Sequence, residues 1–205
     1  MHTGRLLSKY PIISDQIELN ELKILLTCLE SLLARGKHDA VVEFGCFEGT
    51  SSLFIQRLIN AYGTGNEFHV YDSFEGLPGK TGHDESPAGL QFMPGELKAS
   101  KRQLISNFKR SNLQLPYIHK GWFDSLSPHD IPEPICFAFL DGDYYQSILT
   151  PLRLIESKVS SGAYIIVDDY QSESLPGAKK AVDLWANEKG YALTIAHSLA
   201  VIRIP

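Results

Sequence analysis

The stretch at residues 39–52, DAVVEFGCFEGTSS, constrains the fold more than any other part of the chain. It begins with a short run of β-branched and aromatic residues, which is typical of a buried strand. Gly45 and Gly49 then allow a tight turn, and the hydroxyl side chains that follow can satisfy the free N–H groups of a helix start. The stretch therefore predicts a strand, a glycine turn and a helix, which is where open α/β sheets bind nucleotide-like ligands.

The turn differs from the dinucleotide-binding fingerprint G-x-G-x-x-G, because Cys46 takes the place of the middle glycine. Glu43 lies two residues before the turn, and a carboxylate there favours a positively charged ligand group over a phosphate. S-adenosylmethionine carries an amino group and a sulfonium, so its polarity fits. Taken alone, the motif is equally consistent with an ordinary strand–helix turn, and the rest of the chain has to decide.

Composition narrows the class of protein. The 205 residues, of which 43% are hydrophobic, suit a single domain over 1–205 with a normal core. The net charge of -5 argues against a nucleic-acid or membrane-surface partner, which needs a basic footprint. Three widely spaced cysteines argue against a disulfide framework or a zinc site. Because we recognise neither a signal peptide nor a membrane-spanning run, we expect a cytoplasmic protein.

Apolar runs and helical patterns alternate along most of the chain. This order predicts a doubly wound, Rossmann-like α/β sheet with helices on both faces and a C-terminal β-hairpin. Residues 1–13 read as an irregular arm, and Glu18 is placed for a capping box on Asp15. The predicted helices are 15–35, 50–62, 96–110, 144–157 and 178–189. The predicted strands are 39–44, 67–72, 116–120, 135–140, 163–167, 191–196 and 199–204.

Three features beside the glycine turn concern a ligand. The second strand ends at Asp72, the usual position for a carboxylate that binds the ribose hydroxyls of an adenosine group, although an aspartate there also caps turns. Trp122 follows the third strand, where an aromatic ring stacks on adenine or packs in the core. The Gly/Pro-rich residues 76–100 leave the end of the second strand, and a loop of this length beside a site favours a lid.

Two apolar strands each end in a pair of acidic residues: Asp141 and Asp143 after one, Asp168 and Asp169 after the other. In a parallel sheet these strand ends lie on the same edge as the glycine turn. Carboxylates gathered there repel one another, and a divalent cation removes that problem. Oxygen-only ligands select a hard ion such as Mg²⁺. The alternative is that each aspartate caps the loop or helix that follows it.

At this point the chain resembles the macrocin O-methyltransferase family, whose members are class I enzymes that transfer a methyl group from S-adenosylmethionine to hydroxyls of sugars and aromatic natural products. Five blocks carry the resemblance in the family's order: EFGCFEGTSS at 43–52, YDSFEGLP at 71–78, GWFD at 121–124, LDGDYYQS at 140–147 and GAYIIVDDY at 162–170. Two regions depart from the family: the arm before the first helix is shorter than in the antibiotic-tailoring members, and the lid at 79–95 does not align.

The resemblance implies a Mg²⁺-assisted O-methyltransferase acting on a small hydroxylated acceptor. It implies that Asp141, Asp168 and Asp169 hold Mg²⁺. It places around S-adenosylmethionine the two turn glycines and the residues Glu43, Thr50, Ser51, Asp72, Ser73, Trp122 and Asp141.

A general base has to take the proton of the acceptor hydroxyl. Asp141 is the first candidate, and the lid residues His83 and Asp84 are the others. Two further hypotheses stay open: a nicotinamide-dependent oxidoreductase, and a non-catalytic relative that keeps a cofactor pocket. The acceptor's identity and the oligomeric state, including a homo-oligomer, do not follow from the sequence.

Overall fold

The computed structural model describes residues 1–90 and 92–205, and seven strands of this part of the chain form one sheet in the order β3-β2-β1-β4-β5-β7-β6. Strands β1 to β5 run parallel to one another, and β7 is antiparallel to both β5 and β6. The strands are β1 (Ala40–Phe44), β2 (Phe68–Asp72), β3 (Tyr117–Lys120), β4 (Ile135–Leu140), β5 (Val159–Val167), β6 (Leu193–Ala196) and β7 (Leu199–Arg203).

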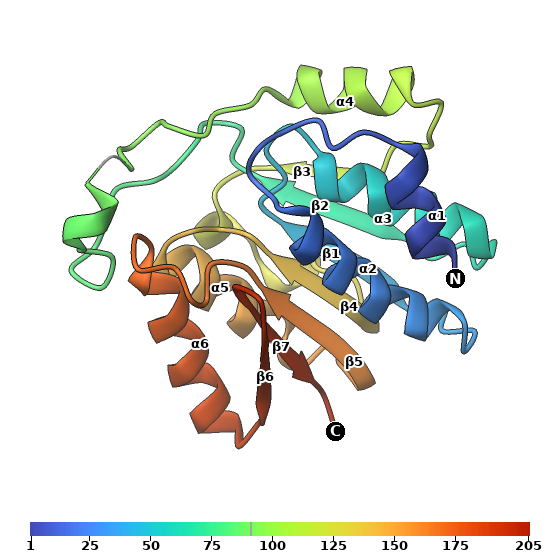
Figure 1. Cartoon of the computed structure of the whole chain (residues 1–205). Coiled ribbons are helices and arrows are strands. Elements are labelled where there is room, and N and C mark those ends of the chain that lie inside the picture. Colours follow the sequence, from blue (N-terminus) through green and yellow to red (C-terminus); the bar gives the residue numbers. More distant parts are fainter. Residues whose placement is uncertain (91) are drawn as a thin grey trace.

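Helices cover both faces of the sheet (Figure 1). One buried hydrophobic cluster packs α2, α3 and α4 against one face, and a second packs α5 and α6 against the other. The predicted doubly wound α/β fold with its C-terminal hairpin is confirmed. The helices are α1 (His2–Lys9), α2 (Leu19–Leu33), α3 (Thr50–Tyr62), α4 (Lys101–Arg110), α5 (Tyr145–Ile155) and α6 (Pro176–Lys189).

The central strands β1 and β4 are buried at every residue, as expected for parallel strands that are covered on both faces. The chain leaves β1 toward β2 on one side, and β4 lies on its other side, so the strand order reverses between these two strands. This is the topological switch point, where open α/β sheets form a crevice at the carboxyl ends of their strands.

The prediction of an irregular N-terminal arm was wrong, because residues 2–9 form α1. The buried carboxylate of Glu30 in α2 accepts hydrogen bonds from the backbone N–H groups of His2, at 2.5 Å, and Thr3, at 3.3 Å. It thereby satisfies donors that a helix start leaves free. The cap comes from a residue 27 or 28 positions away, so local sequence patterns do not reveal it.

The start of α2 was also predicted too early. The capping box forms between Glu18 and Glu21, where Glu21 accepts the backbone N–H of Glu18 at 2.7 Å, and not between Asp15 and Glu18. Ile17 and Leu22 are buried in the same cluster and occupy the positions of a hydrophobic staple. Burial of Ile17 therefore selects the later of two similar capping patterns.

Two other boundaries differ from the prediction by four residues or more. Helix α4 begins at Lys101 instead of 96, because Gly95 and Leu97 have positive φ angles of 86° and 52°, which a right-handed helix excludes. Strand β5 begins at Val159 and continues through Gly162, where φ is 78°, instead of beginning after it.

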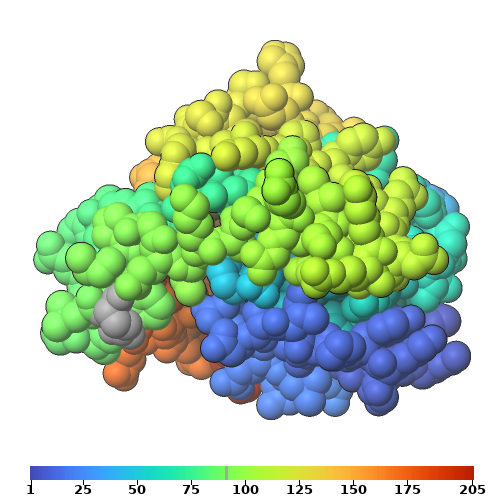
Figure 2. Space-filling view, turned by 90° about the horizontal axis from the view of Figure 1, so that it is seen from above, coloured from blue at the N-terminus to red at the C-terminus, as the bar shows by residue number. Residues whose placement is uncertain are grey.

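The lid segment, residues 76–100, connects β2 to α4 and lies at the side of the molecule toward which the arrowheads of β4 and β5 point (Figure 1). Its base is closed by two backbone hydrogen bonds, from Leu77 N–H to Glu96 and from Gly95 N–H to Leu77. In the space-filling view its green atoms form one end of the molecule (Figure 2). The segment therefore borders the crevice at the carboxyl edge of the sheet.

Candidate active site

The glycine turn after β1 brings two strand ends into close contact. Gly45 has a φ of 85°, and a Cβ atom added to it would lie 1.8 Å from the backbone carbonyl oxygen of Asp141. Only glycine allows this approach. Gly49, with a φ of 91°, has a different role, since a Cβ there would meet the side chain of Leu104 in α4 at 2.3 Å. Gly45 therefore shapes the crevice, whereas Gly49 permits helix packing.

Asp72 ties the end of β2 to the glycine turn. Its carboxylate accepts the backbone N–H groups of Cys46 at 2.9 Å and Phe47 at 3.2 Å through one oxygen, and that of Phe74 at 2.7 Å through the other. The turn-capping role that the sequence offered as an alternative is thus present. Because a carboxylate has about four acceptor positions, the side chain keeps capacity for a further donor.

Glu43 supports the site from beneath. It is 0% exposed, and its carboxylate accepts the hydroxyl groups of Ser51, at 2.5 Å, and Ser52. Burial raises its pKa to about 7, despite these two hydrogen bonds. Thr50 shares a hydrogen bond of 2.8 Å with Ser14. These side chains anchor the start of α3, and none of them lines the cavity described next.

A cavity of about 510 Å³ lies at the carboxyl edge of the sheet. Trp122, which is 40% exposed, lies on its wall and not in the core. The cavity is also lined by predicted site residues Gly45, Asp72, Ser73, Asp141 and Asp169. The remaining predicted site residues lie outside the lining: Glu43, Gly49, Thr50, Ser51, His83 and Asp168.

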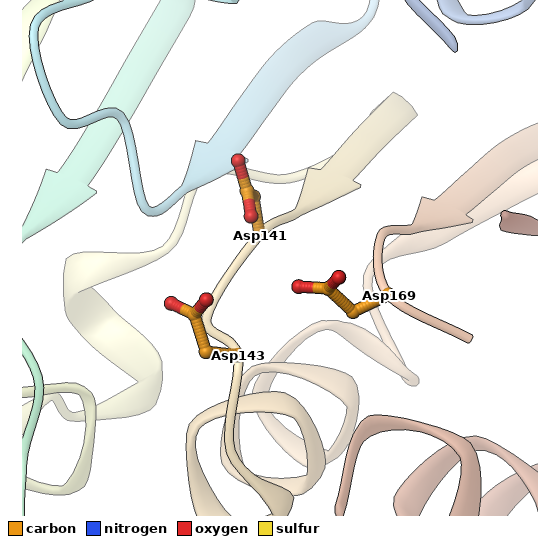
Figure 3. A group of neighbouring side chains, drawn as sticks. All are labelled: Asp141, Asp143 and Asp169. Carbon is orange, nitrogen blue, oxygen red and sulfur yellow. The ribbon is translucent and has the colours of Figure 1, made fainter. Parts of the chain in front are cut away.

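Three carboxylates converge in this cavity. Asp141, Asp143 and Asp169 each place one oxygen atom within 4.8 Å of the others. Figure 3 shows that Asp141 and Asp143 come from the loop after β4 and that Asp169 comes from the loop after β5. Across residues 1–90 and 92–205, no lysine, arginine or histidine forms an ion pair with these three side chains.

In the part of the chain that the structure describes, no cationic side chain pairs with this group. Burial, followed by repulsion from neighbouring aspartates, raises the pKa values of Asp143 and Asp169 to about 7 and that of Asp141 well above its usual range. Asp143 and Asp169 also have positive φ angles, 64° and 57°, which non-glycine residues adopt mostly at constrained sites. Oxygen-only donors with excess negative charge fit a hard divalent cation such as Mg²⁺.

Asp168 lies outside this group, and Asp143, which the sequence analysis did not assign as a ligand, lies within it. The buried carboxylate of Asp168 accepts the backbone N–H of Asp169 at 2.8 Å. Burial, followed by repulsion from Asp169 and then from Glu21 in α2, raises the pKa of Asp168 well above its usual range. The sequence placed Asp143 near Asp141, at the end of the same strand, but only the tertiary structure shows that Asp143 belongs to the group and that Asp168 does not.

The two lid candidates for the general base are arranged differently. His83 is exposed, and its ring stacks on that of Tyr145 with a centroid distance of 4.0 Å. Asp84 is 1% exposed and lines the cavity, but its carboxylate is engaged by Thr81 and Tyr145. Of the three base candidates, only Asp141 belongs to the carboxylate group in the cavity.

The sheet order, the glycine turn at its switch point and the acidic strand ends define a class I methyltransferase fold. The solved structure of the O-methyltransferase NovP is similar, with a TM-score of 0.80 and 26% sequence identity. The match covers 92% of this chain and 81% of that chain.

The macrocin-O-methyltransferase (TylF) family matches residues 14–198, and the chain belongs to this family. The family resemblance predicted from the five sequence blocks is thereby confirmed. The chain is 33% identical to 8-demethyl-8-(2,3-dimethoxy-alpha-L-rhamnosyl)-tetracenomycin-C 4'-O-methyltransferase of Streptomyces olivaceus, over 75% of this chain and 61% of that protein. It is 28% identical to demethyldecarbamoylnovobiocin O-methyltransferase of Streptomyces niveus, over 82% of this chain. The chain thus spans 61% and 65% of the lengths of these two relatives.

Among the described residues, none of the helices combines the length and the apolarity that crossing a bilayer requires.

Proposed function

We propose that this protein transfers a methyl group from S-adenosylmethionine to a hydroxyl group of a small molecule with the assistance of Mg²⁺. The observation that carries the proposal is the group formed by Asp141, Asp143 and Asp169, which lies in a cavity beside the glycine turn. Membership of the macrocin-O-methyltransferase family supports the same chemistry.

The cofactor would occupy the part of the cavity next to Gly45. Asp72 has one acceptor position left for a ribose hydroxyl, Trp122 offers a partly exposed ring for adenine, and Ser73 also lines the cavity. Glu43, Thr50 and Ser51 would act indirectly, because they fix the start of α3 and with it the turn. The family resemblance placed these three residues around S-adenosylmethionine, whereas we now propose that they hold the glycine turn in place without touching the cofactor.

The carboxylate group would hold Mg²⁺ through one oxygen each from Asp141, Asp143 and Asp169. When bound, the ion supplies Lewis acidity that lowers the pKa of a coordinated acceptor hydroxyl. We propose Asp141 as the residue that takes the hydroxyl proton, because its backbone lies directly against the glycine turn.

The acceptor would be a hydroxylated sugar or aromatic natural product. The names of the two relatives describe O-methylation of a rhamnosyl-bearing tetracenomycin and of demethyldecarbamoylnovobiocin. The cavity lining also combines apolar Leu77, Leu97 and Leu175 with polar Gln16 and Thr81. Such a wall suits a ring that carries hydroxyl groups on one side.

Calorimetric titration tests the cofactor first. We expect S-adenosylmethionine and S-adenosylhomocysteine to bind saturably, and Mg²⁺ to bind in the absence of chelator. Titration of NAD⁺ serves as the control for the oxidoreductase hypothesis. The proposal fails if neither S-adenosylmethionine nor S-adenosylhomocysteine binds at millimolar concentration, which would mean a binding free energy weaker than about −4 kcal/mol. Cofactor binding without Mg²⁺ binding would instead favour a relative that lacks metal-assisted chemistry.

Asp169→Ala tests the metal site. We expect this variant to lose Mg²⁺ binding and methyl transfer to a catechol or sugar-diol acceptor, while S-adenosylhomocysteine still binds, because Asp169 belongs to the carboxylate group and not to the glycine turn. The control is Asp39→Ala, at the opposite end of β1, which should leave Mg²⁺ binding intact. An equal loss of cofactor binding in Asp169→Ala would mean that the residue is structural.

A further inference from the structure

The lid segment has a small hydrophobic core of its own. Leu77 is buried together with Tyr144, from the loop after β4, and Leu175, which precedes α6. Phe92 and Leu97 of the lid pack against this cluster, which is separate from the two clusters on the faces of the sheet. The lid is therefore packed directly on the loop that carries Asp141 and Asp143.

One buried carboxylate of the lid joins three segments of the chain. Asp84 accepts the backbone N–H of Tyr145, the first residue of α5, at 2.6 Å through one oxygen. Its other oxygen accepts the N–H of Thr81 at 2.9 Å and the hydroxyl of Thr81 at 2.7 Å. A Cβ atom added to Gly177, in the first turn of α6, would lie 1.9 Å from the first oxygen. Gly177 thus leaves room for this carboxylate between the starts of two helices.

The lid also holds the residue between Asp143 and Tyr145. The ring of Tyr144 is buried, and its hydroxyl donates a hydrogen bond to the backbone carbonyl of Phe92 at 3.2 Å. Both residues that follow Asp143 are therefore fixed by the lid. Asp143 itself has a φ of 64°, a conformation that persists only where the surrounding structure holds it.

We propose that Asp84 is a positioning residue, which orients Asp143 within the carboxylate group by fixing the start of α5, so that binding of a divalent cation depends on a docked lid. This inference rests on the proposed function, since it takes the carboxylate group to be a Mg²⁺ site. It assigns Asp84 a structural task in place of general-base catalysis, because both oxygens of Asp84 already accept hydrogen bonds.

Two chemically different variants test the contact. Asp84→Asn keeps the shape of the side chain but replaces one acceptor oxygen with an NH₂ donor. Either Tyr145 N–H or Thr81 N–H then faces another donor and loses its hydrogen bond. Gly177→Ala keeps Asp84 and displaces its carboxylate, because the added methyl group overlaps it. The controls are Glu85→Gln, at the exposed neighbour of Asp84, and Gly4→Ala, in a helix where an added Cβ meets nothing within 4 Å.

Mg²⁺ affinity measured by calorimetry and amide hydrogen exchange at Tyr145 are the readouts. We expect both variants to weaken Mg²⁺ binding roughly 10- to 100-fold, the range found when a residue that orients a metal ligand is changed. The amide of Tyr145 should exchange faster, whereas S-adenosylhomocysteine should still bind. Glu85→Gln and Gly4→Ala should match the wild-type protein in all three measurements.

Faster exchange at Tyr145 with unchanged Mg²⁺ affinity would overturn the proposal, because the contact would then hold the lid without orienting the carboxylates. Unchanged exchange and unchanged affinity in both variants would overturn it as well. If the wild-type protein itself binds no Mg²⁺, the proposed metal site fails, and the inference with it. If the wild-type protein binds Mg²⁺ and the variants bind it equally well, only the inference fails.

Discussion

At the scale of single residues, the acidic side chains near the glycine turn have different roles, which the neighbouring sequence does not reveal. Glu43 and Asp72 lie on neighbouring strands at the same edge, yet Glu43 holds two serine hydroxyls beneath the turn, and Asp72 holds three backbone N–H groups on the cavity wall. Both side chains lie on the same face of the sheet, because Glu43 pairs with Val70, two residues before Asp72. They differ because Glu43 lies inside β1 against Ser51 and Ser52 of α3, whereas Asp72 is the last residue of β2.

Glu43→Gln should change the pH dependence of stability. Burial raises the pKa of Glu43 to about 7 from an ordinary value of 4.5. The stability that the protonated Glu43 carboxyl group contributes to the folded protein is therefore fully present below pH 4.5 and is lost as the pH rises through 7. Glutamine does not titrate. We therefore expect the free energy of unfolding of the variant, compared with that of the wild-type protein, to be up to about 3 kcal/mol higher at pH 8.5 than at pH 4.5.

Urea unfolding at the two pH values measures this change. Glu67→Gln, at an exposed position before β2, is the control and should show no such gain. Parallel stability curves for Glu43→Gln and the wild-type protein would contradict the assignment of a buried, largely protonated carboxyl group.

At the scale of elements, side chains that are distant in sequence fix where helices begin. Helix α1 has only eight residues, too few to be stable in isolation. It is held by the carboxylate of Glu30, which also accepts the hydroxyl of Tyr62 at 2.9 Å. The same principle applies to α5, whose first N–H is capped by Asp84 of the lid.

Glu30→Ala should release α1. The change removes the acceptor for His2 and Thr3 and leaves the hydroxyl of Tyr62 without its partner. We expect a loss of about 1–2 kcal/mol in the free energy of unfolding and faster hydrogen exchange in residues 2–9. Glu30→Gln, which retains one acceptor oxygen, should lose less. Unchanged protection of α1 in Glu30→Ala would show that apolar packing alone holds the helix.

At the scale of the whole molecule, the fold concentrates negative charge at one edge of its sheet. Asp141, Asp143 and Asp169 come from two loops that the parallel arrangement of β4 and β5 brings together. The metal-free protein is destabilised by their ionisation, since the raised pKa values of Asp143 and Asp169 mean that stability is lost as the pH rises through about 7.

Asp143→Asn should therefore act in opposite directions with and without metal. At pH 8 in chelator we expect it to raise the melting temperature by about 2–4 °C, which corresponds to about 1 kcal/mol for a chain of this size. With saturating Mg²⁺ the wild-type protein should gain stability, and the variant should gain less. Thermal unfolding under both conditions measures this, and a lower melting temperature of the variant in chelator would contradict the repulsion.

The sequence by itself determined the order of strands and helices, the glycine turn, the acidic strand ends and the family. These are local features, because strand burial, turn geometry and short motifs are encoded in neighbouring residues such as those at 39–52. Tertiary structure alone decided that α1 forms, that α2 begins at Leu19, and that Asp143 rather than Asp168 joins Asp141 and Asp169.

It also decided that Glu43 supports the glycine turn instead of facing the cavity, and that Asp84 caps α5. Each of these outcomes depends on a contact between residues that are far apart in the chain, or on which face of a strand the neighbouring helix covers. The spacing of residues indicates that acids gather at one edge, but only packing selects which of them face the cavity.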